Sequence, residues 1–70
     1  MKVEDVEIGE YYLVDLTREV TFVRILCRAC YINLPIAFIC ELGNDTNYIG
    51  IQAKEIIRKA TKNELVLLVL

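Results

Sequence analysis

The stretch EIGEYYLVDLTREVTFVRIL, residues 7–26, decides the fold, because it is typical of two strands joined by a short polar turn. Gly9 tolerates the backbone angles of a turn that leads into the first strand. Along YYLVDL, residues 11–16, side chains point alternately to the two faces of a strand, and Tyr12 and Val14 share one of them. TREV then breaks the apolar pattern. The stretch therefore predicts a β-hairpin.

The second strand of this hairpin continues for a long way, through TFVRILCRACYI at residues 21–32. One alternate set of side chains is almost wholly apolar, and we expect it to face the core: Thr21, Val23, Ile25, Cys27, Ala29 and Tyr31. The other set mixes Arg24 and Arg28 with apolar residues, which suits a half-exposed face. Strict alternation predicts that the two arginines lie on the same face, roughly 13 Å apart by the rise of a strand.

Two further strands follow. NLP, residues 33–35, predicts a turn, and IAFICEL, residues 36–42, predicts a strand rich in β-branched and aromatic residues. GNDTN, residues 43–47, is typical of a hairpin loop. YIGIQ, residues 48–52, predicts a fourth strand, in which Gly50 indicates either a bulge or the close approach of another backbone.

The pattern changes in the last eighteen residues. AKEIIRKATKNE, residues 53–64, favours either a helix of two or three turns or a single 3₁₀ turn followed by a loop. ELVLLVL ends in six uninterrupted apolar residues, and periodicity alone leaves such a run ambiguous. It is long enough for a final strand buried on both faces. Because an uncovered strand of this kind aggregates, we expect the chain's own barrel or a second chain to cover Leu65, Leu67 and Val69.

Composition bounds the class of protein. The 70 residues make one domain, residues 1–70, and 56% of them are hydrophobic, against about 45–50% in typical globular chains. The surplus implies an unusually complete core or a surface that meets another chain, and we favour the second. A net charge of −2 disfavours a nucleic-acid binder, which usually carries a basic stripe. Without a secretory leader or an apolar run of the ~18–20 residues that cross a membrane, we expect a soluble cytoplasmic protein.

Few residue types for catalysis are present. The chain has no histidine, the usual general base near neutral pH, and no serine. Cys27 and Cys30 form a C-x₂-C pair, but Cys40 is the only other thiol and zinc usually takes four ligands. Strand positions 27 and 30 also point to opposite faces. We therefore predict no enzyme, no metal and no cofactor, with free thiols in a reducing compartment.

Arginine and tyrosine supply the candidate binding residues. Guanidinium forks suit phosphate or carboxylate ligands, so Arg24 and Arg28 are candidates to contact an anionic ligand or an acidic partner. The alternative is ordinary surface arginines, paired across the sheet with an acid such as Glu41.

Tyrosine combines apolar area with a polar tip, which makes Tyr11, Tyr12 and Tyr48 candidates for a partner surface. Because neighbours on a strand diverge, at least one of Tyr11 and Tyr12 must face outward.

The order of these elements resembles that of Tudor/KOW-type SH3-like domains. VEIGEYYLVDL followed by TFVRIL is similar to their opening, in which a G-x-x-Y-x-V strand leads to a V-x-V strand. ELGNDTNYIGIQAKEII is similar to their closing hairpin, short strand and helical turn, and the match covers roughly residues 6–60. The resemblance implies a mainly β fold, a small barrel of five to six antiparallel strands with a short helical turn near residues 53–60. Domains of this class bind peptides, methylated side chains, nucleic acids or other subunits, and are rarely catalytic.

These observations favour a non-enzymatic binding module that acts through protein–protein interaction or self-association. A bacterial or bacteriophage accessory protein that docks on a host protein fits such a chain. The alternative is a small barrel that binds nucleic acid or a nucleotide through Arg24, Arg28 and the surface tyrosines.

Overall fold

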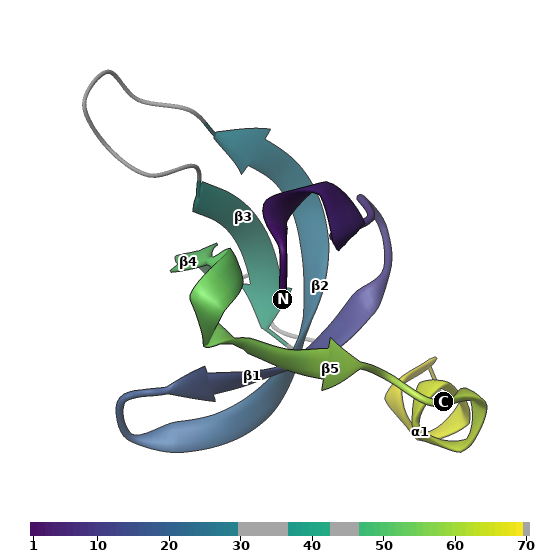
Figure 1. The fold of residues 1–70 in the computed structure, drawn as a ribbon. Coiled ribbons are helices and arrows are strands. Elements are labelled where there is room, and N and C mark those ends of the chain that lie inside the picture. Colours follow the sequence, from purple (N-terminus) through teal and green to yellow (C-terminus); the bar gives the residue numbers. More distant parts are fainter. Residues whose placement is uncertain (30–36, 43–46, 70) are drawn as a thin grey trace.

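The computed structural model describes residues 1–29, 37–42 and 47–69, and within them the fold is mainly β (Figure 1). Five antiparallel strands form one sheet in the order β4-β3-β2-β1-β5. The strands are β1 (Tyr11–Leu16), β2 (Glu19–Ala29), β3 (Ala37–Leu42), β4 (Tyr48–Gln52) and β5 (Ile56–Lys59). The remaining elements are the 3₁₀ turns η1 (Val3–Asp5) and η2 (Ala53–Glu55) and the helix α1 (Lys62–Val69). Over the described residues the sheet is open, with β4 and β5 at its edges.

The hairpin predicted for residues 7–26 is confirmed. β1 and β2 pair from Tyr11 opposite Arg24 to Leu16 opposite Glu19, and a two-residue turn joins them. The regular register keeps Tyr12 and Val14 on one face, where both side chains are buried.

A compact apolar core lies on one face of the curved sheet. Its central side chains are Tyr12, Val14, Val23, Ile25, Phe38, Cys40, Ile51, Ala53 and Ile56. Val3 and Val6, on and just after η1, pack against this core, and Figure 1 shows η1 crossing in front of β2 and β3. The hydroxyl of Tyr12 accepts a hydrogen bond from the backbone N–H of Glu7 at 2.9 Å. The N-terminal segment therefore closes the open side of the core.

A bulge in β2 corrects the predicted faces of that strand. Ile25 lies opposite Cys40, but Cys27 lies opposite Ile39, so Leu26 is an extra residue on β2. One inserted residue exchanges the two faces beyond it. The prediction that Cys27 is buried with Ile25 is therefore wrong, and its side chain is exposed.

The segment after β4 agrees with part of one of its two predicted alternatives. It begins with the single 3₁₀ turn η2, which is followed by β5 rather than by a loop. Figure 1 shows η2 and β5 returning the chain from one edge of the sheet to the other. Because β4 pairs with β3 in unbroken register, Gly50 marks no bulge. A Cβ added at Gly50 would meet nothing within 4 Å, so the described residues show no close approach of another backbone either.

The prediction of a final strand from the apolar run is wrong, because residues 62–69 form the helix α1. The residue before the helix, Thr61, caps its first turn, and this local hydrogen bonding favours a helix over an extended strand. Tyr31, the 33–35 turn and Cys30 lie outside the described residues, as do residues 43–46.

Candidate interaction surface

A capping box fixes the start of α1. The backbone N–H of Glu64 donates to Oγ1 of Thr61 at 3.3 Å, and the N–H of Thr61 donates to Oε1 of Glu64 at 2.8 Å. The carbonyl of Thr61 accepts the first helical bond, from the N–H of Leu65 at 2.9 Å. These bonds satisfy N–H groups that a helix start otherwise leaves unpaired.

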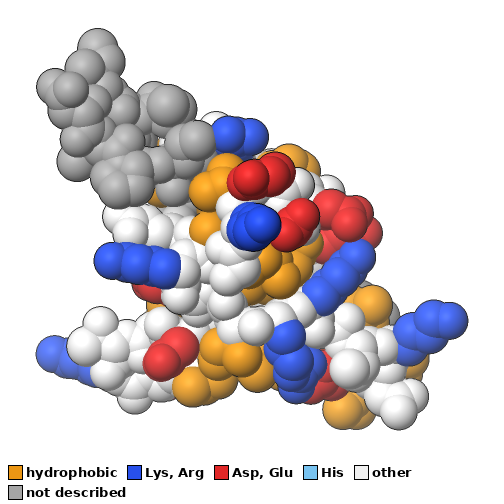
Figure 2. All heavy atoms as spheres, in the orientation of Figure 1, with side chains coloured by type: hydrophobic (Ala, Val, Ile, Leu, Met, Phe, Trp, Pro, Cys, Tyr) orange, Lys and Arg blue, Asp and Glu red, His pale blue; other side chains and the backbone are white. Residues whose placement is uncertain are grey.

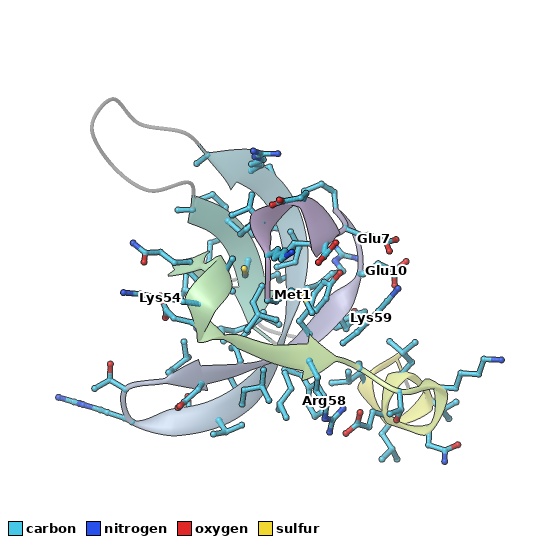
Figure 3. All side chains as sticks on the ribbon, in the orientation of Figure 1. Met1, Glu7, Glu10, Lys54, Arg58 and Lys59 are labelled. Atoms are coloured by element: carbon cyan, nitrogen blue, oxygen red, sulfur yellow. The ribbon has the colours of Figure 1, made fainter. Side chains whose placement is uncertain are left out.

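An ion pair joins this first turn to the sheet. Nη1 and Nη2 of Arg58, on β5, donate to the two carboxylate oxygens of Glu64 at 2.7 and 2.9 Å. The hydrogen bonds from Arg58 and from the backbone of Thr61 lower the pKa of Glu64 to about 2, so this carboxylate stays ionised well below its usual range. Figure 3 shows Arg58 projecting from β5 towards α1. The helix is therefore held to the edge strand by its N-terminal end.

Beyond that end, α1 presents apolar side chains to solvent. Leu67 is 77% exposed and Val66 is 55% exposed, whereas Leu65 and Leu68 are half-buried. α1 makes only sparse contacts with the sheet, and it lies at the outer side of β5 in Figure 1. Of the predicted contact residues, Leu67 is the accessible one. Leu65 faces partly inward, and the side chain of Val69 lies outside the described residues.

A polar row crosses the outer face of the sheet. The row runs through Tyr11, Arg24, Glu41 and Tyr48, which lie opposite one another on β1, β2, β3 and β4. Nη2 of Arg24 lies 3.0 Å from Oε2 of Glu41, so the predicted alternative of a cross-strand ion pair is confirmed. Tyr11 is half-buried, and Tyr48, on the edge strand, is 62% exposed.

Two of the predicted binding residues do not join this row. Tyr12 is 1% exposed, so its ring belongs to the core and is not accessible to a partner. Arg28 lies opposite Phe38, on the core side of the sheet, because the bulge at Leu26 reverses the face of β2. The prediction that Arg24 and Arg28 share a face is therefore wrong, and the two arginines cannot bind one ligand together.

Basic side chains are dispersed rather than gathered. Lys54 is on η2, whereas Arg58 and Lys59 are on β5, at some distance from it in Figure 3. Nζ of Lys59 lies 3.7 Å from Oε1 of Glu7, and Arg58 is paired with Glu64. Figure 2 shows basic and acidic side chains interspersed over the visible face.

The thiols form no site within the described part of the chain. Cys40 is buried, and this burial, with smaller contributions from Cys27 and Glu55, raises its pKa to about 12. Its Sγ lies 3.7 Å from the carbonyl oxygen of Phe38. No three Cys, Asp or Glu side chains gather as metal ligands among residues 1–29, 37–42 and 47–69.

Sequence reasoning missed the contacts that join Thr61, Glu64 and Arg58. The first two carried a recognisable signal, since T-x-x-E before an apolar run is a helix start. Arg58 had none, because its partner is set by the turn between β5 and α1.

Comparison with protein-family models, with curated proteins and with solved structures gave no match. No helix in the described part of the chain combines the length and the apolar character that crossing a membrane requires.

Proposed function

We propose that the chain is a non-enzymatic binding module that docks α1 into an apolar groove on a partner protein. The observation that carries the proposal is the exposure of Leu67 and Val66 on a helix whose first turn is fixed to β5. Helices commonly bind proteins by laying apolar side chains into a groove.

Energetics favour a docked helix over a free one. A helix of eight residues is marginal in water without packing, because its nucleation cost is spread over few bonds. Complete burial of a leucine side chain contributes about 1.5–3 kcal/mol. Docking Leu67 would therefore both stabilise α1 and contribute to binding the partner. The capping box and the ion pair between Arg58 and Glu64 limit the conformational entropy that α1 loses on docking.

We also propose that the fold is SH3-like. The order β5-β1-β2-β3-β4, with a 3₁₀ turn between β4 and β5, supports the architecture that the sequence resembles. A role in recognition rather than catalysis is also part of this proposal.

The nucleic-acid alternative has less support. Arg24 is neutralised by Glu41, and Arg28 lies on the opposite face of the sheet. The net charge is −2, and basic side chains are scattered over four elements, β2, η2, β5 and α1, so the described part of the chain shows no basic stripe of the kind that phosphate binding uses.

The test begins with a photo-crosslinking amino acid at position 67, which labels whatever contacts the helix in cells. The captured protein is then purified, and its affinity is measured for the wild type, for Leu67→Asp and for Thr17→Asp. Thr17 is exposed in the turn between β1 and β2, away from α1, so its variant adds the same charge outside the proposed docking face. Loss of about 1.5–3 kcal/mol predicts binding weaker by roughly 10- to 150-fold for Leu67→Asp alone. Equal affinities for the two variants would refute the proposal.

A further inference from the structure

The two edges of the sheet differ in how they are protected. β5 is short, has a bulge at Ile57 and carries Arg58 and Lys59, all of which discourage pairing with another strand. β4 has none of these devices: its sequence YIGIQ contains no charge and no proline, and its register with β3 is unbroken over all five residues. Unprotected regular edges are templates for a further strand.

The hydrogen bonds of β4 identify the groups that point outward. The N–H of Leu42 donates to the carbonyl of Asn47 at 3.1 Å, which makes this a hydrogen-bonded pair of the antiparallel ladder. Because such pairs alternate, Ile49 and Ile51 bond to β3, whereas Tyr48, Gly50 and Gln52 direct their backbone groups away from it.

One of these outward groups is already engaged. The N–H of Gln52 donates to Oε1 of Glu55 at 3.1 Å, where the chain turns into η2. Tyr48 and Gly50 keep two N–H and two C=O groups on the free side of β4, and no hydrogen bond occupies them within the described residues. Both residues are exposed.

We propose that a second copy of this chain pairs with β4 in antiparallel orientation, about a two-fold axis at Ile49. In this register Tyr48 of each copy lies opposite Gly50 of the other. The N–H of Tyr48 donates to the carbonyl of the opposite Gly50, whose N–H donates back, and the symmetric pair repeats both bonds. All the free outward groups of Tyr48 and Gly50 are then satisfied by four hydrogen bonds.

The alternative axis at Gly50 fits less well. It would place the carbonyl of Tyr48 opposite the N–H of Gln52, which Glu55 already occupies. It would also pair Gly50 with Gly50 of the second copy. The ring of each Tyr48 would then have no glycine opposite it to cover, as it has with the axis at Ile49.

The side chains are complementary under the axis at Ile49. A side chain at Gly50 would meet nothing within 4 Å in a single copy, so the outer surface is open above this residue. The ring of Tyr48, 62% exposed, can cover the opposite glycine, a pairing that stabilises strands containing glycine. On the other face, Ile49 packs beside the core and meets its symmetry mate, with Cα atoms about 4.5 Å apart in a pair of this type.

Hydrogen exchange of the wild type at rising concentration tests this arrangement. The amides of Tyr48 and Gly50 should be slow to exchange in concentrated samples and fast in dilute ones, whereas those of Ile49 and Ile51 should be slow in both. Sedimentation equilibrium should give a mass approaching twice 8.1 kDa over the same range.

Two variants locate the contact. Gly50→Asp meets open space and requires no positive φ, so it leaves the single copy folded, but it sets two carboxylates near the axis. We expect it to weaken association at least tenfold. Ile57→Asp adds the same charge at the opposite edge, where Ile57 is half-exposed, and should leave association unchanged.

Three results would overturn the proposal. One is a monomeric mass up to millimolar concentration. Another is a dimer in which the exchange of the Tyr48 and Gly50 amides does not depend on concentration. The third is a dimer that Leu67→Asp abolishes and Gly50→Asp does not, which would assign self-association to α1. Because binding of a partner by α1 uses a different element, failure of either proposal leaves the other testable.

Discussion

Replacing Thr61 with alanine should unfold α1 while the sheet remains folded. The substitution removes the Oγ1 acceptor of the Glu64 N–H, which lies at 3.3 Å. Loss of an N-cap threonine costs typically ~1 kcal/mol, which lowers the ratio of helical to unfolded α1 about fivefold. For a helix of eight residues with sparse contacts to the sheet, such a change is large enough to empty much of the helical state.

The assay is NMR. The secondary chemical shifts of Leu65 and Leu67 should move towards random-coil values in Thr61→Ala, while signals of the buried Tyr12 and Phe38 stay in place. Thr61→Ser keeps a hydroxyl acceptor and should keep the helical shifts. If the alanine variant retains the shifts of the wild type, the capping box does not determine the helix population, and packing that involves Leu65 and Leu68 must do so instead.

Three further outcomes are expected. Tyr12→Phe leaves the N–H of Glu7 without its 2.9 Å acceptor, which should lower the free energy of unfolding in urea by about 1 kcal/mol and speed exchange of that amide. The pKa of Glu64 is lowered from 4.5 to about 2, so its stabilisation of α1 is complete above pH 4.5 and is lost as the pH falls towards 2; helical shifts that are constant over this window would contradict the pairing. Because Cys40 is buried with a pKa of about 12, mapping of alkylated peptides at pH 8 should find label on the exposed Cys27 and none on Cys40 until denaturant is added.

Local patterns predicted the positions of two strands. Residues 11–16 and 48–52 were predicted as strands and coincide with β1 and β4. The signals were alternation and flanking turn residues, which are set within a few positions. The hairpin from β1 to β2 needs only the two-residue turn between Leu16 and Glu19, so its register also follows from local sequence.

The bulge in β2 has no comparable local signal. Leu26 is apolar and is acceptable on either face, and no glycine or proline marks the inserted residue. The bulge is defined only by the register with β3, in which Ile25 pairs with Cys40 and Cys27 pairs with Ile39. For that reason simple alternation placed Arg28 beside Arg24, and the candidate anionic site built on that placement does not form.

The end of the chain is a different case, because two local signals conflict. Six apolar residues from Leu65 to Leu70 suit a buried strand, and this pattern dominated the prediction. Thr61 and Glu64 stand three apart immediately before the run and predict a helix start. The apolar run is not buried in the described sheet, so the capping signal is the one that agrees with the structure. As part of a helix, exposed apolar residues such as Leu67 are available to contact a partner.

The two proposed surfaces lie at opposite edges of one sheet, and this separation has a consequence for binding. Pairing through β4 would give a continuous ten-stranded sheet, five strands from each copy, with the two β5 strands at its far ends. Since α1 follows β5, the dimer would present two apolar helices that point away from the two-fold axis. A partner with two grooves at matching distance would then bind with an avidity that neither helix provides alone, because the second contact becomes intramolecular. Gly50→Asp should remove this gain in avidity while leaving the affinity of a single groove for Leu67 unchanged. Self-association through β4 would then strengthen partner binding without changing the residues of α1 that contact the partner.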